Sequence, residues 1–184
     1  MPRASDDRAS NVRRPLILPY EGHLPEIDDT AWLAPTATVI GRASVAARAS
    51  IFFGAVVRAD MAEIVLGAGS NLQDNVVVHT DTGFPALIGD GVSVCHSAVV
   101  HGCTVADFCL IGMHATVLNG AVVGTGSLVA AGTVVLEGTE IPPRSLVAGV
   151  PGKVRRTLTD EEYERVVQNA VTYEDLSARH RASR

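Results

Sequence analysis

Valine or isoleucine recurs at every sixth position through much of the second half of the chain. Two positions before each of these residues stands a small side chain such as alanine, serine, threonine or cysteine. The branched members are Val99, Val105, Ile111, Val117, Val123, Val129, Val135, Ile141 and Val147. An earlier array consists of Val39, Val45, Ile51 and Val57, each preceded two positions back by alanine. A regular internal repeat takes precedence over other patterns in predicting a fold.

A six-residue unit is too short for a helix and a turn, but it suits a short strand followed by a corner. Side chains two positions apart point to the same face of a strand, so each unit offers one branched and one small inward group. Three such strands close a triangular coil of about eighteen residues, and stacked coils pair through parallel strands. An open sandwich of short alternating strands is the alternative.

The pattern resembles the hexapeptide-repeat proteins, and this resemblance implies a mostly β fold, a left-handed parallel β-helix. About six to seven coils would form between residues 36 and 153. Val99, Val117 and Val135 are expected in one column, and Val105, Val123 and Ile141 in another. The shorter step from Val94 to Val99 predicts a slip in the register, next to Cys95, whereas Cys103 and Cys109 fit the small inward position.

A helix is predicted after the β-helix. Thr159 followed by Glu162 has the pattern of a capping box, and apolar residues recur at helical spacing from Tyr163 to Val171. We therefore expect a C-terminal α-helix over residues 159–178 that packs on a flat face of the prism. The chain then divides into a disordered tail at 1–14, a β-helix domain with its lead-in segment at 15–155, and the helix with its tail at 156–184.

Composition narrows the class of protein. The chain is 47% hydrophobic but only 4% aromatic, which suits a narrow core of valine, alanine and leucine. Its formal charge of −5 argues against nucleic acid as a partner, and no stretch approaches the ~18 apolar residues of a membrane span. An odd number of cysteines favours reduced thiols, and residues 1–14 lack the apolar segment of a secretion signal. These features predict a cytoplasmic protein.

Two of the six histidines are placed to share a metal ion. His101 follows His79 by 22 residues, which equals about one coil of eighteen plus four inserted residues, assigned to the segment 80–86. Stacked strands lie about 4.8 Å apart, so the two imidazoles are expected in one column. His96 lies up to about 16 Å from His101 along an extended strand, too far to join them within one chain. A neighbouring subunit would supply it, which favours a homotrimer with interfacial sites.

Four segments of the chain resemble the gamma-class carbonic anhydrases. They are VVRAD at 56–60, NLQDNVVVHT at 71–80, CHSAVVHGC at 95–103 and GMHATVLNGAVV at 112–123. The resemblance implies reversible hydration of carbon dioxide to bicarbonate by a metal-bound hydroxide, with zinc as cofactor and iron or cobalt as alternatives. The residues that match the family's metal ligands are His79, His96 and His101.

The resemblance also assigns residues around the metal. Arg58 and Asp60 match an interfacial ion pair, and Asn71, Gln73 and Asp74 match pocket residues. Gln73 would orient water or bicarbonate, and Tyr173 matches a tyrosine near the site, although packing of the helix would also explain it. Asp81 is the only acid in the shortened loop after His79, and we include it with Gln73 and Tyr173 as a catalytic candidate.

Some positions depart from the family pattern. Met61 stands where the archetypal enzyme has a proton-transferring glutamate, and His114 is interpreted as a surface corner residue or a proton shuttle. Two alternatives to the hydratase therefore stay open. One is a weak or inactive homologue that acts as a metal-bearing binding or assembly protein, with a siderophore-binding type of name. The other is a hexapeptide acyltransferase, which needs a catalytic base and a coenzyme A cleft.

Overall fold

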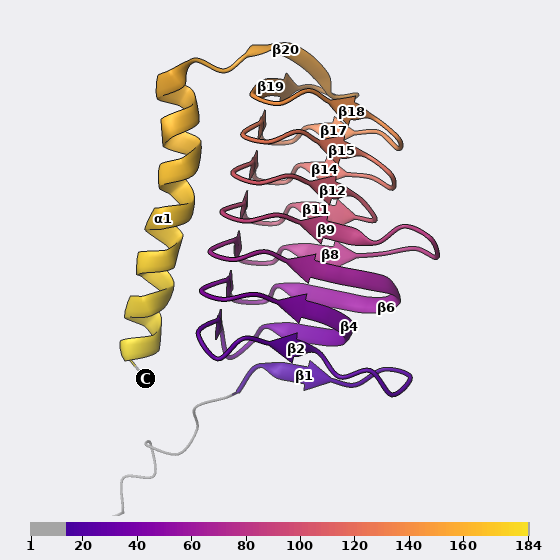
Figure 1. The fold of residues 1–184 in the computed structure, drawn as a ribbon, viewed down its shortest axis with the longest axis vertical. Coiled ribbons are helices and arrows are strands. Elements are labelled where there is room, and N and C mark those ends of the chain that lie inside the picture. The colour runs from indigo at the N-terminus through magenta and orange to yellow at the C-terminus, as the bar shows by residue number, and fades with distance from the viewer. Residues whose placement is uncertain (1–13, 184) are drawn as a thin grey trace, which may run out of the picture.

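The computed structural model describes residues 14–183, which form a tall prism of stacked coils with one long helix along its side (Figure 1). The predicted tail at 1–14 lies outside the described residues except for Arg14. The chain climbs the prism in about seven turns and returns along it through helix α1 (Asp160–Ala182), so both ends of the described chain lie at the base. The predicted parallel β-helix with a C-terminal helix is confirmed.

Two hydrogen-bonded sheets make the three faces of the prism, because the long strands β4 and β6 bend around one corner and join two faces into one sheet. The strands on these two faces are β1 (Leu16–Leu18), β2 (Glu26–Ile27), β4 (Thr38–Val45), β6 (Val56–Leu66), β8 (Val77–His79), β9 (Ala86–Ile88), β11 (Val99–His101), β12 (Thr104–Val105), β14 (Thr116–Val117), β15 (Val122–Val123), β17 (Val134–Val135) and β18 (Glu140–Ile141).

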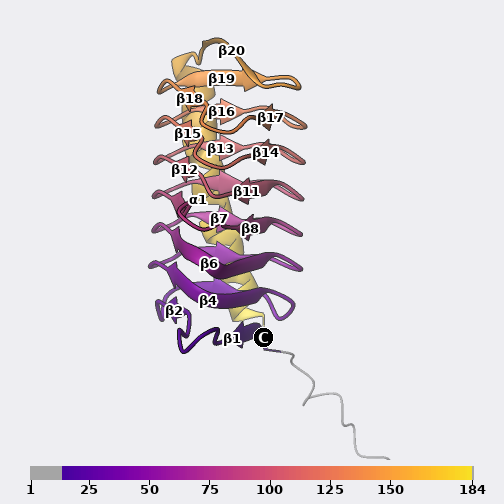
Figure 2. The ribbon, with the colours of Figure 1, turned by 90° about the vertical axis from the view of Figure 1, so that its right-hand side faces the viewer.

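Helix α1 packs on the third face, near strands β3, β5, β7 and β10, and lies on the far side of the prism in Figure 2. The strands of this face are β3 (Trp32–Leu33), β5 (Ser50–Ile51), β7 (Asn71–Leu72), β10 (Ser93–Val94), β13 (Leu110–Ile111), β16 (Leu128–Val129), β19 (Ser145–Ala148) and β20 (Lys153–Thr157). All strand pairs are parallel except β19 with β20, which turns back antiparallel at the top.

One predicted column of the core is wrong by one residue. Val100, not Val99, pairs with Val117, which pairs in turn with Val135. Val100 is fully buried, whereas Val99 faces outward and is half-buried. The regular step of six runs from Val94 to Val100, so the short step lies between Val100 and Val105. The column of Val105, Val123 and Ile141 is confirmed.

The five-residue step therefore falls at the corner between Val100 and Val105, and not at the corner before Val99. The corner after Val100 is one residue shorter than a regular one, and Gly102 turns it with φ +56°. A backbone in this left-handed region suits glycine, because other L-residues are strained there. Cys103 follows this corner and is buried together with Cys109, as predicted. Cys95 lies in a regular corner and is half-buried.

Helix α1 begins with the predicted capping box, in which Glu162 N donates to Thr159 Oγ1 and Thr159 N donates to Glu162 Oε2. Val166 and Ala170 are buried against the prism, but Val171 is 46% exposed, so the predicted apolar stripe is narrower than expected. The helix extends to Ala182, four residues beyond the prediction. Its end is attached by Arg181, whose guanidinium donates to the carbonyl groups of residues 30 and 31.

Among residues 14–183, no helix combines the length and the apolar character required to cross a bilayer.

Candidate metal centre

His79 and His101 lie side by side on the face of the prism that β8, β11, β14 and β17 form, which we call the histidine face. They are register partners at the ends of β8 and β11, as the count of 22 residues predicts. Nδ1 of His79 lies 2.9 Å from Nε2 of His101, and the ring centroids are 4.9 Å apart. The four-residue insertion is accommodated by a turn closed by a bridge between Asp81 and Phe84, which leaves the stacking of the two histidines intact.

The second ring nitrogen of His79 is held by Asp60. Nε2 of His79 lies 3.0 Å from Oδ1 of Asp60, and Arg58 donates to the other oxygen of the same carboxylate. Burial on its own raises the pKa of Asp60, but the hydrogen bonds from Arg58 and His79 and the charge of Arg58 together hold that pKa below its usual range. Asp60 is thus a carboxylate at neutral pH and accepts a hydrogen bond from the N–H group at His79 Nε2. This leaves Nδ1 of His79 without a proton, as an acceptor.

Asn119 holds the second ring nitrogen of His101, and the sequence reasoning did not assign it a role. Its Oδ1 lies 2.7 Å from Nδ1 of His101, and its Nδ2 donates to Oδ2 of Asp81 at 2.8 Å. The signal that could have found it is its position 18 residues after His101, one coil further along the chain. His101 therefore donates from Nδ1, and its Nε2 is an acceptor.

These hydrogen bonds leave two imidazole lone pairs facing each other. His79 Nδ1 and His101 Nε2 are both acceptors in this assignment, and they are 2.9 Å apart. Two facing acceptors repel unless a proton or a cation lies between them or one ring moves. Neutral imidazole nitrogens of this kind are common ligands of zinc, iron and cobalt, so the donor set fits a metal.

His96 lies at the opposite end of the same face, in the corner before β11. Its Nδ1 is 2.9 Å from Oδ2 of Asp74, and its Nε2 is 3.3 Å from the hydroxyl of Tyr173 on helix α1. Burial raises the pKa of Tyr173, and the nearby Cys95 and Asp74 raise it further, so the phenol stays protonated and donates to His96. Within residues 14–183 of one chain, no three histidine, cysteine, aspartate or glutamate side chains lie together in a group that could hold a metal ion.

Asn71 and Gln73 belong to the His96 end of the site and not to the pair of His79 and His101. Both are 1% exposed, on the face that α1 covers. Nε2 of Gln73 donates to Oδ1 of Asn71 at 3.2 Å, and Gln73 also contacts the Cys95 thiol, whose pKa burial raises to about 11. The predicted site residues thus form two groups on one chain.

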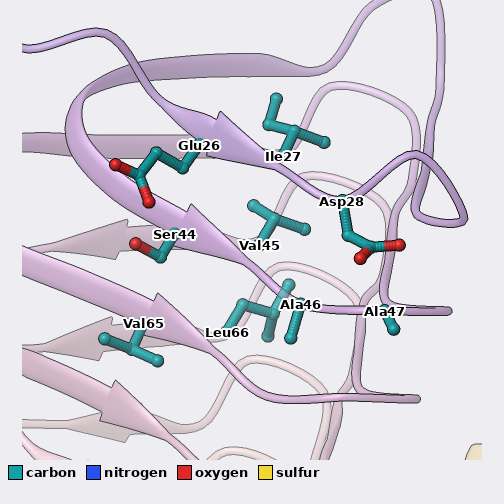
Figure 3. A pocket seen from close by; sticks show the side chains of 9 residues that line it. All are labelled: Glu26, Ile27, Asp28, Ser44, Val45, Ala46, Ala47, Val65 and Leu66. Atoms are coloured by element: carbon teal, nitrogen blue, oxygen red, sulfur yellow. The ribbon is translucent and has the colours of Figure 1, made fainter.

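The remaining candidates lie on the surface. Met61 is 45% exposed, and His114 is an exposed corner residue with φ +57°, as its interpretation as a surface residue requires. A shallow cavity of about 400 Å³ lies elsewhere, over β2, β4 and β6, with the carboxylates of Glu26 and Asp28 on either side (Figure 3). No histidine lines this cavity.

The coil architecture defines the chain as a hexapeptide-repeat protein. A solved structure of a hexapeptide transferase family protein from Anaplasma phagocytophilum aligns with a TM-score of 0.86 at 37% identity, over 89% of this chain and 96% of that one. No protein-family model matches the sequence.

Relatives in sequence define the family. A protein of Methanocaldococcus jannaschii named probable carbonic anhydrase is 53% identical over 79% of this chain and 91% of its own length. Gamma carbonic anhydrase 2 of Arabidopsis thaliana, named as mitochondrial, is 43% identical over 85% of this chain, which spans 58% of the Arabidopsis protein. The chain therefore belongs to the gamma carbonic anhydrase family. A cytoplasmic location stays a prediction.

Proposed function

We propose that the protein is a metal-dependent carbonic anhydrase that interconverts carbon dioxide and bicarbonate at the interfaces of a homotrimer. Membership of the family supports the reaction class. The observation that carries the site is the 2.9 Å separation of His79 Nδ1 and His101 Nε2. The hydrogen bonds of both rings assign these two nitrogens as acceptors, and such a pair suits a shared cation.

The metal would be held by His79 and His101 of one subunit and by His96 of the next. Zinc is the proposed ion, and iron and cobalt are the alternatives. When bound by three neutral imidazoles, the metal lowers the pKa of a coordinated water to about 7 and so supplies the nucleophile at neutral pH.

The chain's own residues orient these ligands. Asp60 accepts from His79 Nε2, and Asp74 accepts from His96 Nδ1, so each carboxylate fixes one ring and leaves its other nitrogen for the metal. Tyr173 donates to that nitrogen of His96 in the single chain and is proposed to turn to the substrate pocket in the trimer. Gln73 is proposed to orient bicarbonate, and Asp81 to accept a proton near the site.

Exposed apolar side chains near the histidines support assembly with further copies of the chain. Val77 and Leu136, which lie on or beside the histidine face, are 38% and 48% exposed, and Met113 at its corner is 51% exposed. Arg58 and Asp60 pair within the chain at the edge of this face and are proposed to contact the neighbouring subunit. Covering such a face with a second and third copy would remove apolar surface from water.

Stopped-flow hydration of carbon dioxide tests the reaction, with the protein loaded anaerobically with iron or with zinc. His101→Ala is the control that removes one ligand. Activity above this control is expected for at least one metal, and activity equal to it with every metal would overturn the hydratase proposal. Analytical ultracentrifugation tests the trimer, and a monomeric mass at full metal occupancy would overturn it.

A second candidate function is a weak or inactive homologue that binds a metal and acts in assembly or binding. The observation that favours it is Met61, an exposed apolar side chain where the archetypal enzyme carries a proton-transferring glutamate. Full metal occupancy and a trimeric mass without hydration activity would select this function. Acetyl transfer from acetyl coenzyme A, assayed beside hydration, separates the acyltransferase alternative.

A further inference from the structure

Asn119 connects a proposed metal ligand to the loop that follows the first histidine. Its Oδ1 is bonded to His101 Nδ1 at 2.7 Å and its Nδ2 to Asp81 Oδ2 at 2.8 Å. A carboxylate only accepts hydrogen bonds, so Asp81 requires the NH₂ group of Asn119 on its own side. The carbonyl oxygen of Asn119 then has to face His101, and the orientation of the amide is fixed by the loop.

We propose that Asn119 and Asp81 form a positioning pair that holds His101 with its proton on Nδ1 and its lone pair on Nε2. Asn119 contacts the ligand directly, whereas Asp81 acts through Asn119. This inference rests on the proposed metal site. It adds the two residues that determine which ring nitrogen of His101 carries the proton. An amide in the opposite orientation would present its NH₂ group to Nδ1, and the ring proton would then move to Nε2, where it blocks metal binding.

The short corner at Gly102 provides the space for this contact. A Cβ at Gly102 would overlap Oδ1 of Asn119 and would lie 2.9 Å from Cβ of Phe84. A Cβ at Gly120 would lie 3.3 Å from the Phe84 ring. Glycine at both corners thus lets Asn119 reach back by one coil and lets the loop lie against it. The missing residue in the repeat and the inserted loop serve the same contact.

His79 and His101 are held by partners of different charge. The anionic Asp60 holds His79, while the neutral amide of Asn119 holds His101 and is itself bonded to the anionic Asp81. A carboxylate thus contacts the His79 ring directly, whereas the carboxylate of Asp81 reaches the His101 ring only through Asn119. This difference makes the pair testable, because exchanging the amide and the carboxylate keeps both hydrogen bonds and reverses only the direction of the one between positions 81 and 119.

Metal affinity of four variants tests the proposal, measured for Zn²⁺ and Co²⁺ by competition with a chromogenic chelator. Asn119→Leu and Asp81→Leu are each expected to weaken binding by about 10- to 100-fold, the range found for outer-shell partners. Asn119→Asp alone places two carboxylates in contact and should also weaken binding. The double variant Asp81→Asn with Asn119→Asp restores the hydrogen bonds and should recover affinity to within a few-fold of the original protein.

Asp28→Leu is the matched control, because it removes a carboxylate that accepts hydrogen bonds from Thr30 in a corner away from the histidines. It should leave metal affinity unchanged. Asn119→Leu with the affinity of the original protein, or a double variant no better than Asn119→Asp, would overturn the positioning role.

Nuclear magnetic resonance of the metal-free protein gives a second readout. With ¹⁵N-labelled histidine, the ring of His101 should show its proton on Nδ1, and Asp81→Leu should increase the Nε2–H form. A His101 ring protonated on Nε2 in the original protein would contradict the inference. If the original protein bound no metal, the proposed function would fail, while these spectra would still decide the positioning role.

Discussion

Asp74 lies beside His96 at the same corner of the preceding coil, and its Oδ2 accepts a hydrogen bond from His96 Nδ1 at 2.9 Å. The backbone also joins the two corners, because the N–H group of Ser97, the residue after His96, donates to the carbonyl oxygen of Asp74. His96 Nε2 is left as an acceptor, which Tyr173 occupies within the chain and which a neighbouring subunit's metal site would take over in the proposed trimer.

Removing this carboxylate should weaken metal binding without unfolding the prism. Asp74→Leu is expected to lower the affinity for Zn²⁺ by about 10- to 100-fold, because His96 loses the group that fixes its ring. The measurement is chelator competition, with the mass in solution followed in parallel. Asp74→Asn keeps an acceptor and should stay close to the original protein, so equal losses in both variants would contradict this explanation.

Gly102→Ala should disturb both stability and the metal site. The φ of +56° costs about 1–2 kcal/mol for an L-residue, and the new Cβ overlaps the amide oxygen of Asn119. Gly132→Ala is the matched control, since its φ is +69° but nothing lies within 4 Å of the added Cβ. Urea unfolding should show a larger loss for Gly102→Ala, and metal affinity should fall only in that variant.

Ile111→Ala should be among the more destabilising single changes in the core. Ile111 is fully buried between Val94 in the coil on one side and Val129 in the coil on the other. Truncating such a side chain costs about 2–5 kcal/mol, whereas Ile111→Val costs about 0.5–1.5 kcal/mol. Urea unfolding at constant protein and metal concentration measures both, because assembly and metal binding also shift stability. A loss from Ile111→Ala no greater than that from Ile111→Val would show that the coils close over the cavity.

Acid should weaken the hydrogen bonds and the ion pair that Glu162 makes in the first turn of helix α1. Hydrogen bonds from Arg156 and from the backbone of Thr159 lower the pKa of Glu162 to about 2. A depressed pKa contributes stability that is fully present above the unfolded value of about 4.3 and is lost as the pH falls toward 2. Glu162→Gln should therefore reduce the free energy of unfolding more at pH 6 than at pH 3. The same reduction at both pH values would argue against an ionic contribution, and salt should diminish the effect.

The repeat in the sequence was sufficient to predict the coils and the stacking of His79 on His101, because both follow from counting residues along a regular strand and corner. The capping box was predicted separately, from the spacing of Thr159 and Glu162 before a helical pattern. The count failed at Val99, since a short corner after Val100 and an early slip before Val99 give the same spacing from Val94 to Val105. Only the backbone distinguishes them.

Asn119 was missed for a different reason. An asparagine before a glycine is ordinary at a turn, and its partners are determined by which side chains meet across coils. The division of the site residues into two groups was partly visible, because the distance from His96 to His101 along a strand already separated them. The placement of Gln73 beneath the helix depends on where α1 docks, which the helical pattern alone does not determine.

Strand β20 has a consequence for how the protein behaves at high concentration. A ladder of parallel strands ends in an open edge that another molecule could extend, and repeated extension would produce a filament. β20 runs antiparallel along β19 and closes that end of its sheet with a strand that carries Lys153 and Arg155, while its third cation, Arg156, is paired with Glu162. Like charges on the last strand repel a second copy, so molecules should not stack end to end through β20. Lateral association through the histidine face remains open.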